Sequence, residues 1–110
     1  MDKTKALAAF SALSQPTRLD AYRLLIRAGV EGMAAGDIAA HLGVRQNTMS
    51  VNLSVLTQAG LLRNTREGRS IRYFADLDGM RGLLGFLMED CCGGNPELCQ
   101  PLIQDITCPC

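Results

Sequence analysis

The sequence has little of what many metal sites and membrane proteins require. It has no tryptophan, no cysteine before residue 91 and a single histidine, His41, which we interpret as a surface or supporting residue rather than a ligand. No apolar run approaches the roughly 20 residues of a membrane-spanning helix, so we expect no membrane partner. The opening Met-Asp-Lys-Thr-Lys has no apolar signal segment, which predicts a cytoplasmic protein.

The length and composition favour one compact domain, or one that completes its core by dimerising. The 110 residues are 47% hydrophobic and 20% charged. The net charge of zero conceals a segregation, because residues 45–72 hold five arginines against one glutamate and residues 76–110 carry a net charge of −5. The basic centre could meet phosphate, although four net charges can also mark a solvated face.

Apolar spacing predicts four helices in the first half of the chain, over residues 2–12, 16–28, 34–42 and 46–59. We expect Leu7, Ala8, Phe10 and Ala12 on the apolar side of the first. Ser14 is the expected N-cap of the second, with Pro16 in its first turn. Gly43 ends the third helix in a position that favours a left-handed cap, and only three residues separate it from the fourth. Such a pair predicts a helix-turn-helix, in which the second helix reads DNA.

The fourth helix carries short polar side chains at its start. Met49, Leu53 and Leu56 are expected to face inward, which leaves another set outside: Gln46, Asn47, Thr48, Ser50, Val51 and Asn52. Gln and Asn can pair with adenine, Ser and Thr with phosphate or base, and Val51 with a thymine methyl. The alternative is an ordinary polar helix surface.

A β-hairpin is predicted over residues 61–65 and 70–74, with a glycine-bearing turn at residues 66–69. Its arginines would lie along a phosphate backbone as the wing of a winged helix. With the residue before the fourth helix, the expected basic DNA contacts are Arg45, Arg63, Arg66, Arg69 and Arg72.

A fifth helix begins near Leu77, with Asp76 or Asp78 as N-cap and Gly93-Gly94 as terminator. Its apolar stripe is either core or a dimer interface shared with residues 2–12, and we favour the interface. The expected interface residues are Leu7, Phe10, Met80, Leu83, Leu84 and Leu87. The predicted fold is therefore mainly α, a dimeric winged helix-turn-helix of about five helices plus a hairpin over residues 1–90, followed by a cysteine-rich tail over residues 91–110.

All five cysteines lie in that tail, at positions 91, 92, 99, 108 and 110. In a reducing compartment such a cluster favours a soft-metal site over disulfides, with a redox switch or an incidental cluster as alternatives. Glycines after Cys91 and Cys92 let the chain reverse, so Cys99 can complete a three-sulfur pocket. Three thiolates suit trivalent arsenic or antimony, whereas tetrahedral zinc or cadmium would need a fourth donor from Cys108 or Cys110.

Three segments together resemble the ArsR/SmtB family of bacterial metal-responsive repressors. Leu13-Ser14-Gln15-Pro16-Thr17-Arg18 is similar to the family's opening of the second helix. Residues 44–62 resemble its recognition helix, and Gly68-Arg69-Ser70-Ile71-Arg72-Tyr73 resembles its wing. The resemblance covers residues 7–77 and implies a homodimeric repressor of operator DNA. Asn52 stands where the family commonly has a histidine.

The metal sites that the family places elsewhere do not match this sequence. Ala34 and Gly36 occupy the cysteine positions of its arsenic box, and residues 77–90 hold no histidine. The Cys91-Cys92 pair with Cys99 resembles instead an arsenite-responsive subgroup. We therefore predict a repressor that releases DNA on binding As(III) or Sb(III) through these cysteines and controls a metalloid-resistance operon.

Other functions remain open at this point. The same fold could sense Cd(II), Pb(II) or Zn(II), or serve as a thiol redox switch. A thiol-based arsenate reductase is a further alternative. We predict no enzyme, because no oxyanion-binding loop with a cationic partner surrounds any cysteine.

Overall fold

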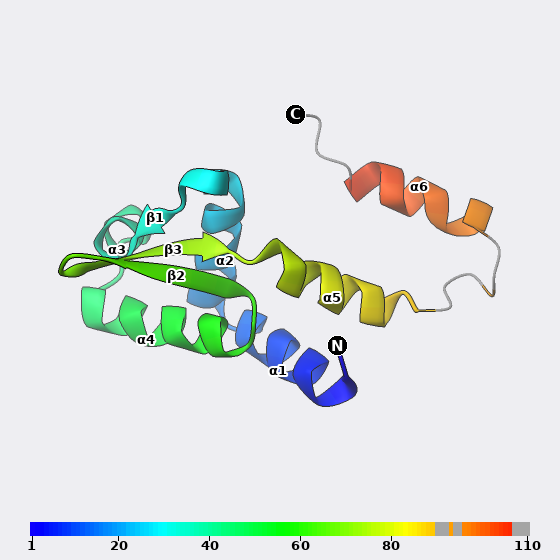
Figure 1. Ribbon diagram of the computed structural model, residues 1–110, viewed down its shortest axis with the longest axis horizontal. Coiled ribbons are helices and arrows are strands. Elements are labelled where there is room, and N and C mark those ends of the chain that lie inside the picture. The colour runs from blue at the N-terminus through cyan, green and yellow to red at the C-terminus, as the bar shows by residue number, and fades with distance from the viewer. Residues whose placement is uncertain (90–92, 94–95, 107–110) are drawn as a thin grey trace.

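The protein is a small winged helix-turn-helix domain (Figure 1), described here from a computed structural model that covers residues 1–89, 93 and 96–106. The elements in chain order are α1 (Lys3–Leu13), α2 (Pro16–Ala28), the 3-10 helix η1 (Gly29–Glu31), β1 (Met33–Ala34), α3 (Ala35–Leu42), α4 (Gln46–Gln58), β2 (Leu62–Glu67), β3 (Ser70–Ala75), α5 (Leu77–Leu87) and α6 (Pro96–Ile106). The predicted fold class is confirmed.

A three-stranded antiparallel sheet holds the predicted hairpin in place. Its strand order is β1-β3-β2, and the hairpin register runs from Leu62 opposite Ala75 to Glu67 opposite Ser70. Gly68 in the connecting turn has φ of 62°, a left-handed conformation that glycine adopts without strain. The two-residue strand β1 was not predicted, because so short a segment has no readable period.

The core lies where α2, α3 and α4 meet the sheet. The largest fully buried side chains are Leu25, Ile38, Met49, Leu53, Leu56, Leu61 and Leu83. Tyr22 and Tyr73 are also buried, and burial is the main reason that the pKa of each phenol is raised; the negative charge of Asp76 raises the pKa of Tyr22 further. Since the predicted inward positions of α4 are buried, its orientation against the core is confirmed.

Helix α1 differs from the prediction in the face that it buries. Its inward residues are Ala6, Ala9 and Ala12, whereas Leu7 is 59% exposed and Phe10 is 36% exposed. Alanines allow the helix to approach the core closely, so the larger apolar residues point outward. Of the predicted apolar side, which also included Ala8, only Ala12 is buried in this protomer, whereas Leu7 and Phe10 stay exposed as a predicted dimer surface.

The junction between α1 and α2 also corrects a predicted cap. Gln15, not Ser14, caps α2, because its side-chain oxygen accepts a hydrogen bond of 2.8 Å from the backbone N–H of Arg18. Ser14 closes α1 instead, since its hydroxyl donates to the Phe10 carbonyl at 2.8 Å.

Helix α5 begins as predicted, because the Asp76 side chain accepts a hydrogen bond of 3.1 Å from the backbone N–H of Gly79. Leu83 is 1% exposed in the isolated chain, so its assignment to a dimer interface is wrong: the side chain belongs to the core of its own protomer. Met80 is half-buried against the same core. Leu84 and Leu87 are exposed and stay available to a partner.

The tail contains a helix, α6, that was not predicted. Pro96 stands at its start, and Leu98, Leu102 and Ile106 recur at intervals of four residues on its exposed surface. The internal Pro101 concealed this period, since proline disfavours a helix interior. None of the described helices is long and apolar enough to cross a membrane.

Candidate nucleic-acid interface

The helix-turn-helix is formed by α3, a short turn and α4. Gly43 has φ of 66° and ψ of 34°, the left-handed conformation expected of a glycine C-cap. The Val44 N–H donates to the Ala39 carbonyl at 3.0 Å and closes the end of α3. Arg45 is the N-cap of α4 without a side-chain cap, so its exposed guanidinium stays available at the start of that helix. The turn therefore fixes where the first residues of α4 emerge.

The first half of α4 exposes the polar surface that the sequence predicted. Five of the six expected residues are exposed: Gln46, Asn47, Thr48, Ser50 and Val51. Val51 is apolar, yet it is 65% exposed. Its side chain is therefore free to contact a thymine methyl group in the major groove. The Asn47 side-chain oxygen accepts from the Thr48 N–H at 2.9 Å and helps to satisfy the open first turn. This surface has donors, acceptors and one apolar group, as base-edge recognition requires.

Asn52 does not belong to this exposed surface. It is only 7% exposed, and its Oδ1 accepts a hydrogen bond of 3.2 Å from Arg18 Nη1. The position lies one turn after Met49 and one turn before Leu56, on the buried side of the helix. The prediction that Asn52 faces outward with the DNA-reading residues is therefore wrong.

The wing presents two of its four arginines freely. Arg66 lies opposite Ile71 near the tip of the hairpin, and Arg69 lies in the turn. Both are exposed, and within the part of the chain that the structure describes neither forms an ion pair. Figure 1 places the hairpin tip at the end of the molecule where α4 begins. The wing and the start of α4 can therefore approach one duplex together.

Arg72 is held by the fold rather than free for phosphate. Its Nε lies 2.7 Å from Glu67 Oε1, and its Nη1 donates to the Glu31 carbonyl at 2.9 Å. Thr65 is its cross-strand neighbour, and Glu67 follows on the same face of the hairpin. The sequence predicted Arg72 as a DNA contact, but the structure gives its guanidinium an internal role in joining β3 to the end of η1.

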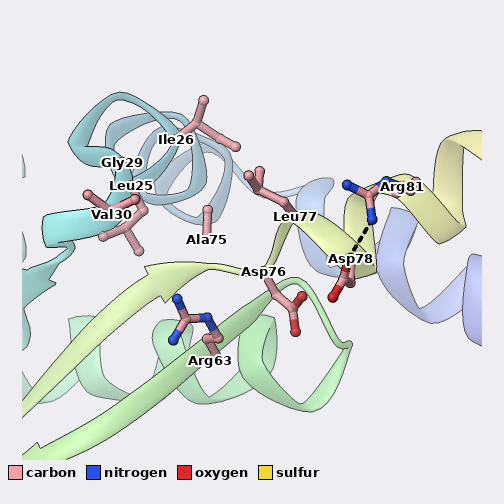
Figure 2. Close-up of a pocket in the computed structure, with 10 residues that line it drawn as sticks. All are labelled: Leu25, Ile26, Gly29, Val30, Arg63, Ala75, Asp76, Leu77, Asp78 and Arg81. Atoms are coloured by element: carbon pink, nitrogen blue, oxygen red, sulfur yellow. Dashed lines mark hydrogen bonds and ion pairs between the residues drawn. The ribbon is translucent and has the colours of Figure 1, made fainter.

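Arg63 lies at the base of the hairpin, away from the tip. Its guanidinium carbon is 4.5 Å from the centre of the Phe74 ring, a cation–π contact. Arg63 is one of the residues that line a cavity of about 490 Å³. Figure 2 shows it with the other lining residues, among them the paired Asp78 and Arg81. The sequence predicted Arg63 as a DNA contact along the wing. Because it is the second residue of β2 and lies opposite Phe74, the hairpin places it at the end away from the tip, a position that does not favour a shared contact with the tip arginines.

The predicted thiol site falls largely outside the described residues. Cys91, Cys92, Cys108 and Cys110 lie outside them, and Cys99 lies in α6. Among residues 1–89, 93 and 96–106, no three His, Cys, Asp or Glu side chains gather as a metal site. The three-sulfur pocket stays a prediction.

Together, the turn, the exposed face of α4 and the hairpin define a winged helix-turn-helix DNA-binding domain. A profile of the helix-turn-helix domain matches residues 13–65. The transcriptional repressor SdpR of Bacillus subtilis is 30% identical over 89 residues, which cover 81% of this chain and 96% of SdpR. The regulator CmtR of Mycobacterium tuberculosis is 38% identical over 79 residues, or 71% of this chain. The match spans 64% of the length of CmtR.

Solved structures agree with this assignment. A homodimeric winged helix-turn-helix domain from Mycobacterium bovis, a possible ArsR-family regulator, is 28% identical with a TM-score of 0.64, covering 79% of this chain and 81% of that one. A possible transcriptional regulator for arsenical resistance is 28% identical with a TM-score of 0.61, covering 88% of this chain and 94% of that one. The chain belongs to the ArsR family of winged helix-turn-helix proteins.

Proposed function

We propose that this protein is a transcriptional repressor that binds operator DNA as a homodimer. The observation that carries the proposal is the exposed polar half of α4 beside two free wing arginines, Arg66 and Arg69. The polar half of α4 would read base edges in the major groove, and the arginines would contact phosphates on either side. The relatives named as transcriptional regulators support this reading and argue against an enzyme.

The dimer would form through α1 and α5, which contact each other in the protomer. Leu7, Phe10, Leu84 and Leu87 leave an exposed apolar surface on these two helices. Apolar patches of this kind mark association surfaces. The homodimeric domain from Mycobacterium bovis supports the same assembly.

The effector that we propose is As(III) or Sb(III), held by the thiolates of Cys91, Cys92 and Cys99. The support is chemical: three soft sulfur donors suit a trivalent thiophilic ion. The resemblance of the Cys91-Cys92 pair to arsenite-responsive family members points the same way. So does the structural neighbour described for arsenical resistance. The genes controlled would then include a metalloid-resistance operon.

Release of DNA would follow from the place of these residues in the chain. Cys91 and Cys92 come soon after α5 ends at Leu87, and Cys99 lies in α6. Capture of one ion by all three would tie α6 to the end of α5, a helix of the proposed dimer interface. A small rotation of α5 there would alter the separation of the two α4 helices, which must match half-sites about 34–36 Å apart. Binding of ion and DNA would be reciprocally coupled.

The test is a titration of fluorescent operator DNA with reduced protein, followed by anisotropy, in the presence of As(III), Sb(III), Cd(II), Pb(II) or Zn(II). We expect As(III) and Sb(III) to release DNA. Single Cys→Ser variants at positions 91, 92 and 99 should bind DNA normally and lose this response. The Cys108→Ser, Cys110→Ser double variant is the matched control and should still respond.

Other outcomes would select among the alternatives. A double variant that fails to respond would favour a four-sulfur site for a divalent metal. Release by peroxide alone, reversed by a thiol reductant and without any metalloid effect, would favour the redox switch. Turnover of arsenate would identify a reductase.

A further inference from the structure

The side chain of Arg18 connects three helices. Its Nε donates to the carbonyl oxygen of Ala12 near the end of α1 at 2.6 Å, and its Nη1 donates to Asn52 Oδ1 in α4 at 3.2 Å. Its own position at the start of α2 is fixed, because its backbone N–H donates to the Gln15 side chain. One partly buried guanidinium therefore joins the end of α1, the start of α2 and the middle of the DNA-reading helix.

Both acceptors need this partner. The last four carbonyls of a helix have no partner within the helix, and in α1 the Ala12 carbonyl is one of them. Asn52 is the one buried amide or charged side chain among the described residues. A buried amide without a hydrogen bond would cost on the order of 1–3 kcal/mol. Arg18 thus satisfies two groups that the fold would otherwise leave open.

The bond to Asn52 also fixes the rotation of α4. A guanidinium has donors and no acceptors, so it must bond the oxygen of the amide and not its nitrogen. Asn52 is adjacent to Val51, which is 65% exposed, and it lies one turn after Thr48. Any rotation of α4 about its axis would carry Asn52 away from Arg18. Together with the buried Met49, Leu53 and Leu56, this bond therefore holds the residues that face DNA in one direction.

We propose that Arg18 is a positioning residue for DNA recognition, which locks α4 to the C-terminal end of α1 through Asn52. Helix α1 carries Leu7 and Phe10, which are exposed and belong to the proposed dimer surface. In a dimer the pairing of the α1 helices would then set the direction and separation of the two α4 helices. The inference rests on the proposed function, since it presupposes a dimer that reads two half-sites.

The experiment is a double-mutant cycle on DNA affinity with Arg18→Met, Asn52→Leu and the double variant. Methionine keeps much of the apolar stem, and leucine has the same number and branching of side-chain heavy atoms as asparagine without its acceptor. The DNA is a duplex selected from a random library with the wild-type dimer. We expect each single variant to bind about tenfold more weakly, and the double variant to bind no more weakly than the weaker single variant.

Two further readouts separate positioning from direct contact and from general destabilisation. The slope of log affinity against log salt should not change in Arg18→Met, because no phosphate contact is lost; a slope reduced by about one unit would mean that Arg18 touches phosphate, and would overturn the proposal. The preference for the selected half-site spacing over spacings one base pair longer or shorter should fall at least about threefold, since a freed α4 no longer has one direction.

Control variants distinguish a failure of the positioning role of Arg18 from a failure of the proposed DNA-binding function. Arg23→Met removes an exposed arginine of the same helix and should change neither affinity nor spacing preference. Additive losses in the cycle, or an unchanged spacing preference, would overturn the positioning role while repression stands. A wild-type protein that selects no duplex would overturn the proposed function itself. If Arg18→Met does not fold by circular dichroism, Arg18→Lys, which keeps the charge without the planar fork, replaces it with the same expectations.

Discussion

Gly79 in α5 packs against the backbone of Gly60, just after α4, so closely that the contact leaves no room for a Cβ atom. The next link is also made by backbone, since the Asp76 N–H donates to the Leu61 carbonyl at 2.9 Å. Helix α5 is thus attached to the turn that follows the DNA-reading helix. A movement of α5 reaches the end of α4 through these contacts, while Arg18 holds α4 at its middle.

The first prediction concerns this contact. Gly79→Ala should lower the free energy of unfolding by about 1–3 kcal/mol, because the new methyl group meets the Gly60 backbone, which cannot move aside as a flexible side chain would. Gly36→Ala in α3 is the control, since a Cβ there meets only an ordinary contact with the Gln46 side chain. It should be neutral or stabilising by up to about 1 kcal/mol. Urea unfolding measures the free energy of unfolding of both variants. Equal changes in Gly79→Ala and Gly36→Ala would contradict the close contact between Gly79 and Gly60.

The second prediction separates the arginines of the hairpin. Arg66→Ala and Arg69→Ala should weaken binding to every DNA sequence and lower the salt slope by about one unit for each lost phosphate contact. Arg63→Ala should leave the slope unchanged, because Arg63 stacks on Phe74 at the base of the hairpin. Anisotropy at four salt concentrations tests this. An unchanged slope in both tip variants would remove the wing from the interface.

The third prediction concerns sequence preference. Gln46→Ala and Thr48→Ala should change which bases are preferred, since both side chains are exposed in the first turn of α4. Ser54→Ala removes an exposed hydroxyl from the same helix one to two turns further on, and it should bind the same sequences as wild type. Selection from a random duplex library would show the difference. Identical selected motifs in all four proteins would contradict the assignment of α4 as the reading helix.

The sequence predicted an element wherever its apolar residues recur at a regular spacing. Helices α2 to α5 and the hairpin were predicted because their apolar spacing is regular, and Gly43 and Asp76 were recognisable caps. Strand β1 and helix α6 were missed, and within the predicted helices the main errors concern which side of the helix is buried. Asn52 was placed outside by its polarity, although its spacing from Met49 and Leu56 puts it inside. Its hydrogen bond to Arg18, 34 residues earlier in the chain, offsets the free-energy cost of burying the amide, and this long-range partner is not visible in the local sequence.

The wing shows the same limit for strands. Four arginines within ten residues predict a basic hairpin, but their charges do not say which of them are engaged. The cross-strand register brings Arg72 near Glu67 and Arg63 beside Phe74, and this register depends on how the whole hairpin pairs. The composition of residues 45–72 thus identified a basic region, whereas which of its arginines are free and which are engaged required the three-dimensional arrangement.

The fourth prediction concerns the dimer. Leu87→Glu should weaken dimerisation by about 100-fold, because a carboxylate would be buried without a partner in an apolar interface. Val30→Glu is the control, since Val30 is 93% exposed in η1, outside the two interface helices. Sedimentation velocity at protein concentrations between about 1 and 100 µM would measure both dissociation constants. Loss of the dimer in the control alone would place the interface elsewhere.

The last prediction concerns Tyr22, whose hydroxyl is buried and has no hydrogen-bond partner among the described residues. Tyr22→Phe should therefore raise the free energy of unfolding at pH 7 by about 1 kcal/mol, since the fold no longer buries an unsatisfied donor. Burial, and next the charge of Asp76, raise the pKa of this phenol above its ordinary value of 10.0. Urea unfolding of the variant at pH 7 tests the first of these effects, and a less stable variant would show that the hydroxyl is bonded after all.

The pH dependence of the same variant follows from the sign of that shift. The unfolded chain ionises Tyr22 at a pH near 10, whereas the folded chain holds the proton to higher pH. The stability that this difference contributes is complete below pH 10 and is lost as the pH rises through the folded pKa. Between pH 9 and 11 the wild type should thus lose stability more steeply than Tyr22→Phe, in which only Tyr73 still contributes such a loss among the two tyrosines. Parallel stability curves for the two proteins over that range would contradict the raised pKa of Tyr22.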